Sequence, residues 1–178
     1  MRNLALDSLD EFLSKVENRA FKMALIATGQ EQDALDIVQD SMLQLAQKYA
    51  HKPEMEWPPL FHRILQSKIR DWYRRQQVRN KWRTFFNNDD ENIDLIEHAI
   101  DINVRESTES LHQSRAIESL ENALHLLPLR QQQAFLLRAW EGLDVSETAT
   151  AMQCSQGSVK THYFRAIKAL KKLLEDYQ

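Results

Sequence analysis

A scarcity of glycine and proline most restricts how this chain can fold. Its 178 residues include three glycines and four prolines, and tight β-hairpin turns depend largely on these residue types. Apolar residues instead recur at spacings of three and four, as at Leu9, Phe12, Leu13 and Val16. That spacing is the period of an amphipathic helix. We therefore expect an all-α fold.

Composition limits the function classes. An apolar content of 43% with 28% charged residues is typical of soluble globular proteins. A single cysteine, Cys154, excludes an internal disulfide framework and suits a reducing compartment. The N-terminus carries acids where a signal peptide needs an apolar core, and no apolar run is long enough to span a bilayer. We expect a cytoplasmic protein without membrane insertion.

Catalytic and metal-binding motifs are missing from the sequence. The six histidines form no HExxH motif or other close metal-ligand pair, and Cys154 suits a small apolar role better than nucleophilic chemistry. We therefore expect no metal, no cofactor and no enzymatic activity.

Periodic segments predict the helices. The first runs from Leu9 to a stop at Thr28 and Gly29, and the second begins near Gln30. Prolines break the chain around Trp57, and a third helix starts at Pro59 or Leu60 and ends near Arg83. After an acidic stretch the pattern resumes from Ile117 to Leu127, from Pro128 to Gly142, and in two further helices.

Charge divides the chain into two basic modules and an acidic separator. Residues 68–83 hold seven Lys or Arg and one acid, whereas residues 87–101 hold six acids and no Lys or Arg. Such asymmetry is typical of nucleic-acid contact beside an acidic linker, although a solvated charged helix is the plainer alternative. We expect two small helical domains, at 1–86 and 114–178, joined by a linker at 87–113.

The third helix has an apolar face and a basic face. At about 100° per residue, Phe61, Leu65, Ile69 and Trp72 share one side. Cations on the opposite side can follow a phosphate backbone, and a neighbouring tyrosine can stack on an unpaired base unless it belongs to the core. The predicted DNA-binding residues of this helix are Arg63, Ser67, Arg70, Tyr73 and Arg74.

The last two helices form a helix-turn-helix pattern. The segment DVSETATAM is followed by Gln153, Cys154 and Ser155 before the next helix begins. Ser155 can cap that helix by accepting a hydrogen bond from its free N–H groups.

The second helix of this pair predicts a DNA-reading face. Val159, Tyr163, Ala166 and Leu170 cluster on one side, which exposes the other. A packed helix normally exposes charges, but a bulky exposed phenylalanine among cations favours insertion into a major groove. The predicted residues are Ser155, Ser158, Lys160, Thr161, Phe164, Arg165 and Lys168.

Three segments in this order resemble the bacterial RNA polymerase sigma factors, and within them the small two-domain extracytoplasmic-function (ECF) group. Residues 33–45, DALDIVQDSMLQL, resemble the polymerase-binding helix of that family. Residues 57–75, WPPLFHRILQSKIRDWYRR, resemble its promoter-melting and −10-element helix. Residues 127–170 resemble the domain that binds the −35 element.

The resemblance implies that the chain binds core RNA polymerase, directs it to promoter DNA and assists melting. The polymerase-binding residues would be Asp36, Gln39 and Asp40. Ser67 stands where asparagine is usual in the melting helix, and Leu35 replaces a common acid. Gln153 occupies a turn position that often holds glycine in the family, so we expect it to adopt a left-handed conformation. An anti-sigma factor as a further partner is left open.

Two other functions remain open. GSVKTH also resembles the recognition helix of response-regulator activators, although the N-terminal half lacks the strand and helix alternation of a receiver domain. A helical adaptor that binds only proteins is the second.

The acidic separator is expected to be mostly flexible, with one short helix at 93–99. About 27 residues reach roughly 90 Å when extended, so the domains would be free to separate. In the free protein the acids of this linker, or those of the acidic second helix, would screen the basic helices from stray DNA.

Overall fold

The computed structural model describes residues 4–86 and 111–175, and within these ranges every regular element is helical. The all-α prediction is therefore confirmed for the described part of the chain. The predicted flexible linker and its short helix at 93–99 lie outside the described residues, except that a helix already begins at Leu111. None of the described helices has the length and hydropathy needed to cross a membrane.

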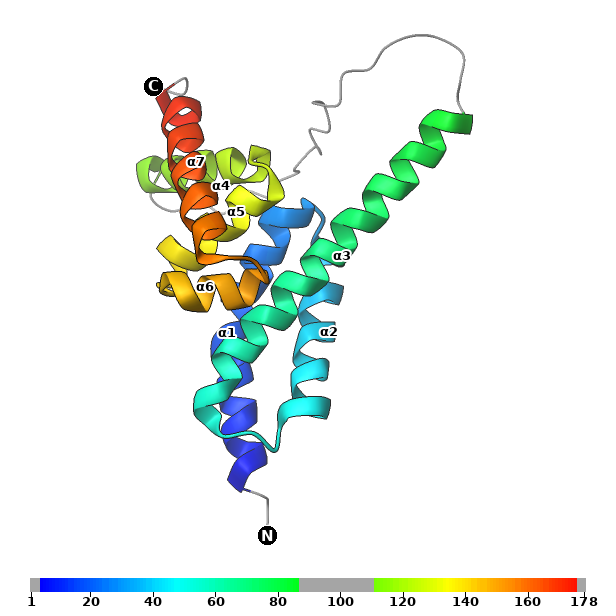
Figure 1. Cartoon of the computed structure of the whole chain (residues 1–178), viewed down its shortest axis with the longest axis vertical. Helices are drawn as coiled ribbons and strands as arrows, with labels where there is room; N and C mark the ends of the chain where they lie inside the picture. The colour runs from blue at the N-terminus through cyan, green and yellow to red at the C-terminus, as the bar shows by residue number, and fades with distance from the viewer. Residues whose placement is uncertain (1–3, 87–110, 176–178) are drawn as a thin grey trace.

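Between residues 4 and 86 the structure contains three α-helices: α1 (Leu4–Thr28), α2 (Glu31–Tyr49) and α3 (Trp57–Phe86). In Figure 1 α1 and α2 run side by side, and α3 crosses them and extends beyond both at its C-terminal end. The predicted stop between the first two helices is confirmed. Gly29 has a φ of 67°, and the hydroxyl of Thr28 accepts a hydrogen bond from the Gln30 N–H at 3.3 Å.

The third helix begins earlier than its sequence suggests. After the 3-10 turn η1 (Glu54–Glu56), α3 starts at Trp57 and takes both following prolines into its first turn. First-turn N–H groups have no partner within a helix, so proline is tolerated there. The indole N–H of Trp57 donates to the Tyr49 carbonyl at 3.1 Å, which fixes the corner between α2 and α3.

Among residues 111–175, four helices and a π turn make up the C-terminal half. They are α4 (Leu111–Leu126), α5 (Leu129–Phe135), the π turn η2 (Leu136–Trp140), α6 (Val145–Met152) and α7 (Gln156–Glu175). Pro128 stands just before α5 as its N-cap residue. The backbone N–H of Glu141 bonds to the Leu136 carbonyl, five residues back, which makes the turn wider than an α-helical one.

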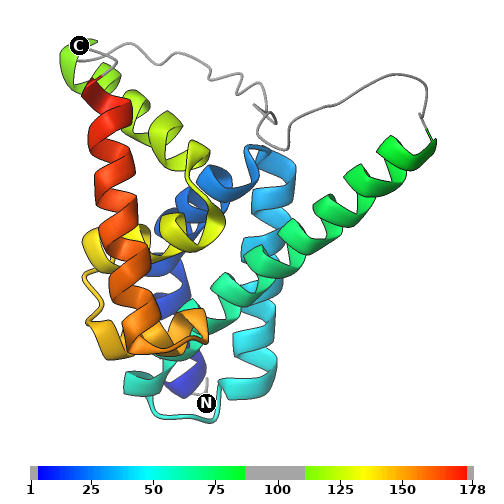
Figure 2. The same ribbon diagram turned by 45° about the horizontal axis from the view of Figure 1, so that its top comes forward.

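The two halves pack against each other. Figures 1 and 2 both place α6 against the middle of α3, and α4 lies near α1. Leu124, Leu127 and Leu136 belong to the same buried cluster as the core of α1, α2 and α3. A second, smaller cluster lies within the C-terminal half and contains Ala134, Leu137, Ala149, Ala151, Met152 and Val159. We expected the two domains to be free to separate, but in this structure they are in contact.

Candidate functional site

The first helix of the helix-turn-helix is fixed by a capping box. The Asp144 carboxylate accepts the backbone N–H of Glu147 at 2.7 Å, and the Glu147 carboxylate accepts the backbone N–H of Asp144 at 2.8 Å. Two N–H groups that α6 would otherwise leave unpaired are thus satisfied. Thr148, Ala149, Ala151 and Met152 turn inward and are buried.

The turn between α6 and α7 has the predicted geometry. Gln153 adopts the left-handed conformation, with φ 53° and ψ 53°, and the backbone N–H of Cys154 bonds to the Ala149 carbonyl. Ser155 caps α7 by accepting the backbone N–H of Ser158 at 3.1 Å, and the two serine hydroxyls lie 2.9 Å apart. Both predictions made for this turn are confirmed.

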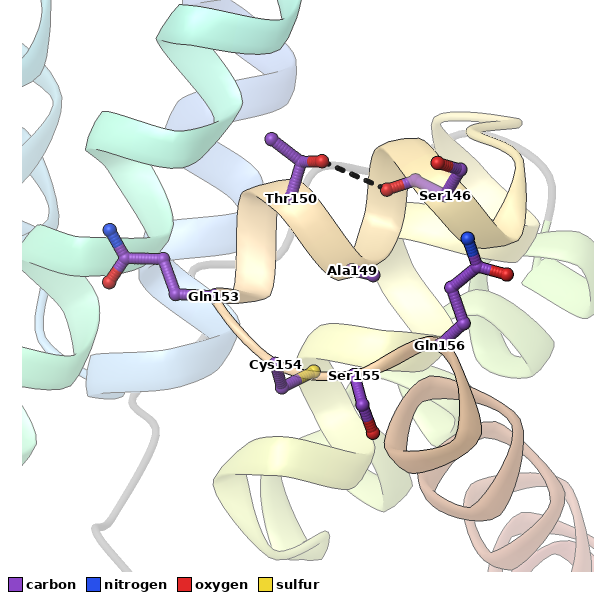
Figure 3. Close-up of a pocket in the computed structure, with 7 residues that line it drawn as sticks. All are labelled: Ser146, Ala149, Thr150, Gln153, Cys154, Ser155 and Gln156. Carbon is purple, nitrogen blue, oxygen red and sulfur yellow. Dashed lines mark hydrogen bonds between the residues drawn. The ribbon is translucent and has the colours of Figure 1, made fainter.

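Small polar side chains line a shallow, open hollow at this turn. Figure 3 shows Gln153 extending from the turn towards α3, away from Ser155 and Gln156. The remaining lining residues are Ser146, Ala149, Thr150 and Cys154. Across the described part of the chain, no group of His, Cys, Asp or Glu side chains is arranged to hold a metal ion.

The outer face of α7 is exposed as predicted. Phe164 has 69% of its surface exposed, which is unusual for a phenylalanine, whereas Val159, Ala166 and Leu170 on the opposite side are buried. Of the other predicted DNA-reading residues, Ser158 is half-buried, and the exposed ones are Ser155, Lys160, Thr161, Arg165 and Lys168.

Aromatic packing holds α7 on its domain. The ring of Tyr163 stacks on Phe135 with centroids 6.2 Å apart, and the Arg138 guanidinium lies 5.7 Å from the Tyr163 centroid. Burial, then the charges of Arg130 and Arg165, lower the pKa of His162. The neutral imidazole is therefore favoured, and arginine and lysine side chains supply the positive charge of this region.

The predicted stripe on α3 is only partly exposed. Arg63 and Arg74 face solvent and Ser67 is half-buried, but Arg70 is 8% exposed. The expectation that Arg70 lies on an open face is wrong for this structure. The spacing of about 100° per residue did identify the apolar face of α3 correctly. Its members are buried in the N-terminal core: Phe61, Leu65, Ile69 and Trp72. At Arg70 the basic face of α3 contacts the C-terminal half and is therefore not exposed to solvent.

Tyr73 lies between the two alternatives that its position left open. It is half-buried, packs edge-on against Trp72 with centroids 5.4 Å apart, and burial raises the pKa of its hydroxyl. Trp72 is a core residue, as predicted.

The polymerase-binding candidates lie together on the outer face of α2. Asp36, Gln39 and Asp40 are exposed, and so are two apolar neighbours, Leu35 at 38% and Leu43 at 56%. Exposed leucines on a helix that also presents carboxylates indicate a contact surface.

Residues of α3 complete this surface, and sequence reasoning did not assign them to it. Lys68 donates to the Asp40 carboxylate at 3.3 Å. A groove between α2 and α3 is lined by Asp33, Asp36, Ile37, Asp40, Lys68, Asp71, Trp72 and Arg75. The only sequence signal for it was the acidity of α2 beside a basic helix.

Comparison with known proteins agrees with this architecture. Residues 117–170 match the family model described as "Sigma-70, region 4". That segment, which runs from α4 into α7, is similar to region 4 of the sigma-70 factors. The chain is 36% identical over 72 residues to the ECF RNA polymerase sigma factor BldN of Streptomyces coelicolor, over 40% of this chain and 27% of BldN. It is 39% identical over 75 residues to the RNA polymerase sigma-E factor of Streptomyces antibioticus, over 42% of this chain and 40% of that protein.

These matches confirm the predicted resemblance to the ECF sigma factors. The chain spans less than half the length of the two curated relatives. A solved structure of the sigma factor RpoE in complex with the anti-sigma factor NepR, from Bartonella quintana, matches with a TM-score of 0.63. The match covers 94% of this chain and 97% of that one at 21% identity, so it shows a shared fold.

Proposed function

We propose that this chain is a sigma factor that binds core RNA polymerase, directs it to specific promoters and assists promoter melting. The observation that carries the proposal is the exposed face of α7, where Phe164 stands among cations within the segment matched as sigma-70 region 4. The relatives named above are RNA polymerase sigma factors.

Duplex DNA of the −35 element would be read by α7. Arg165 is exposed and suits a bidentate contact with guanine, and Phe164 suits the methyl group of thymine. The capped first turn of α7 would approach a phosphate. The proposed residues are Ser155, Ser158, Lys160, Thr161, Phe164, Arg165 and Lys168.

The −10 element and the opened strand would be bound by α3. Unstacking costs a few kcal/mol per step, and arginine contacts with aromatic stacking can offset it. Arg63 and Arg74 are exposed for this role, whereas Ser67 and Tyr73 are half-buried and Arg70 is buried in the packed arrangement. The domains would be 1–86 and 114–178, the second extended at its start because α4 begins at Leu111.

Core polymerase would bind the outer face of α2. Asp36, Gln39 and Asp40 present a negative and hydrogen-bonding surface beside two exposed leucines. Such a surface fits a basic partner with an apolar component.

The remaining features follow from this role. We expect a non-enzymatic factor that needs no cofactor and works in the cytoplasm beside the polymerase. The solved neighbour is bound to an anti-sigma factor, which supports an anti-sigma partner for this chain as well.

Run-off transcription tests the proposal. Core polymerase and genomic fragments should give discrete transcripts only when the chain is added. The double variant Asp36→Asn, Asp40→Asn should weaken binding to core polymerase, while Glu31→Gln, exposed at the start of the same helix, serves as the control.

Three outcomes would contradict the proposal. Promoter-specific DNA binding at full strength without core polymerase would favour the activator alternative. Binding to acidic proteins without any transcript would favour the adaptor. Unchanged polymerase binding by the double variant would remove α2 from the interface.

A further inference from the structure

Gly157 is a glycine that the fold does not require. The chain has three glycines, and the other two, Gly29 and Gly142, have φ values of 67° and 71°, a conformation that favours glycine. Gly157 instead lies in the first turn of α7 and has a right-handed helical backbone. Alanine is a better helix former than glycine, so the local conformation does not explain this residue.

Packing does not explain Gly157 either. A Cβ atom added there would have its nearest contact, apart from its own helix backbone, with the Ser155 hydroxyl oxygen at 3.8 Å. That is an ordinary van der Waals distance, and the position is exposed. The structure therefore has room for a side chain here. Close approach by another molecule is the remaining use of a glycine at such a position.

Gly157 stands at one end of the exposed stripe of α7. Residues spaced by three or four along a helix share a face, and Thr161, Phe164 and Lys168 follow at these spacings. They are all exposed, as is Arg165 beside them, and the Thr161 hydroxyl donates to the Gly157 carbonyl at 3.0 Å. This stripe is the proposed DNA-reading face. The face therefore begins with a position that has no side chain.

The length of α7 from Gly157 to Arg165 matches the width of a major groove. At a rise of about 1.5 Å per residue, the two residues are about 12 Å apart along the helix axis. The major groove of B-form DNA is also about 12 Å wide. With Phe164 and Arg165 at base edges, the first turn of α7 lies at one wall of the groove. That wall is a sugar–phosphate strand.

The first turn of α7 also presents N–H groups to such a strand. Ser155 accepts the N–H of Ser158 on its hydroxyl at 3.1 Å and the N–H of Val159 on its carbonyl at 3.1 Å. Because helical bonds run four residues back, α7 itself offers no acceptor to the two preceding N–H groups, those of Gln156 and Gly157. The Cα–Cβ bonds of a helix tilt towards its N-terminus. A methyl group at position 157 would therefore project towards the same end of the helix as these N–H groups.

We propose that Gly157 is a positioning residue for DNA, because its missing side chain lets the first turn of α7 lie directly against a phosphate of the −35 element. An N–H···O bond needs about 2.9 Å between nitrogen and oxygen, whereas a methyl carbon holds neighbouring atoms about 3.5 Å away or more. Gly157 thereby sets the depth at which Phe164 and Arg165 enter the groove. This inference rests on the proposed function.

Promoter binding by the full chain together with core polymerase tests this role. The DNA is a labelled genomic fragment that gives a run-off transcript with the wild-type chain, and binding is measured by fluorescence anisotropy. Gly157→Ala should weaken binding about tenfold or more, the effect of losing one charge-assisted hydrogen bond. Gly157→Leu should weaken it further, because a longer side chain holds α7 farther from the strand. The loss should be equal on fragments with substituted −35 base pairs, since a phosphate carries no direct sequence information.

Thermal unfolding of the free full chain separates this role from a structural one. Gly157→Ala should leave the unfolding midpoint unchanged or raise it, because alanine favours the helix and has room. The matched control is Ala139→Leu, which adds bulk at an exposed position of η2 in the same half of the chain. The control should bind the promoter fragment like the wild-type protein.

Three outcomes would overturn the inference. They are equal promoter affinity of Gly157→Ala and the wild-type protein, a lowered unfolding midpoint of Gly157→Ala, and a loss of affinity confined to one base pair. Absence of any transcript with the wild-type chain would instead overturn the proposed function. Binding of the free chain to the same genomic fragments would then provide the comparison between Gly157→Ala and wild type, and a free chain that binds none of them would overturn the inference as well.

Discussion

Leu136 and Leu137 are consecutive residues whose side chains enter different clusters. Leu136 belongs to the cluster shared by both halves, and Leu137 belongs to the small cluster under the helix-turn-helix. They are 2% and 0% exposed, so burial alone does not distinguish them. We predict that Leu137→Ala unfolds the C-terminal half selectively, while Leu136→Ala mainly weakens its attachment to the N-terminal half.

The expected loss of stability for Leu137→Ala is large relative to the total stability of the C-terminal helices. Truncating a fully buried leucine to alanine costs about 2–5 kcal/mol. The C-terminal helices run from Leu111 to Glu175, about 65 residues, for which a total stability of roughly 3–10 kcal/mol is ordinary. The Leu137 cluster has six buried members, so few neighbours can close the cavity.

Urea unfolding with amide hydrogen exchange is the assay. Leu137→Ala should lower the exchange protection of α6 and α7 by the predicted 2–5 kcal/mol and leave α1 and α2 protected. Leu136→Ala should preserve protection within α6 and lower the protection of the amides where α4 meets α1. Equal loss of protection in both halves for both variants would refute the division into two clusters.

Three further predictions concern α6, α7 and the buried histidine. Arg165→Ala should cost about 1–3 kcal/mol at one position of the −35 element and relax specificity there, measured by fluorescence anisotropy on substituted duplexes; a uniform loss on all sequences would make it a phosphate contact. Asp144→Ala should remove the cap of α6 and lower the urea midpoint by an amount equivalent to about 1 kcal/mol, whereas Asp144→Asn keeps an acceptor and should lose less. Burial, then the charge of Arg19, lower the pKa of His62 to about 4. An unfolded histidine titrates at about 6.5, so stability is present above that pH and should fall by about 2 kcal/mol between pH 7 and pH 5. His62→Gln should flatten this loss in pH-dependent thermal unfolding, although the raised pKa of Glu141 opposes it in both proteins; an equal acid loss in the variant would exclude His62 as the cause.

Periodicity predicted the faces of single helices well. The buried face of α7 and the exposure of Phe164 were predicted from the helical period, because both depend only on residues within one helix. The left-handed Gln153 was expected from the family resemblance, which places it at a turn position that often holds glycine.

Contacts between distant segments were not predictable from the sequence. The helical period divides α3 into faces but does not indicate which segment covers each face. Arg70, for example, donates a hydrogen bond to the carbonyl of Met152, 82 residues away. The groove beside α2 is lined partly by Lys68 and Asp71 of α3, so the sequence of α2 alone could not predict it. Helix ends were displaced where first-turn prolines permitted an earlier start, as in α3.

The π turn makes the contact of Glu141 sensitive to chain length. A π turn accommodates one residue more than the α-helix that it interrupts. Deleting one residue between 136 and 140 would restore regular helix and rotate all that follows by about 100° about its axis. Glu141 would then turn away from Arg19, although every side chain that forms their ion pair would still be present. Among homologous chains, a one-residue gap at this turn should therefore accompany the loss of an acid at position 141 or of the arginine at position 19.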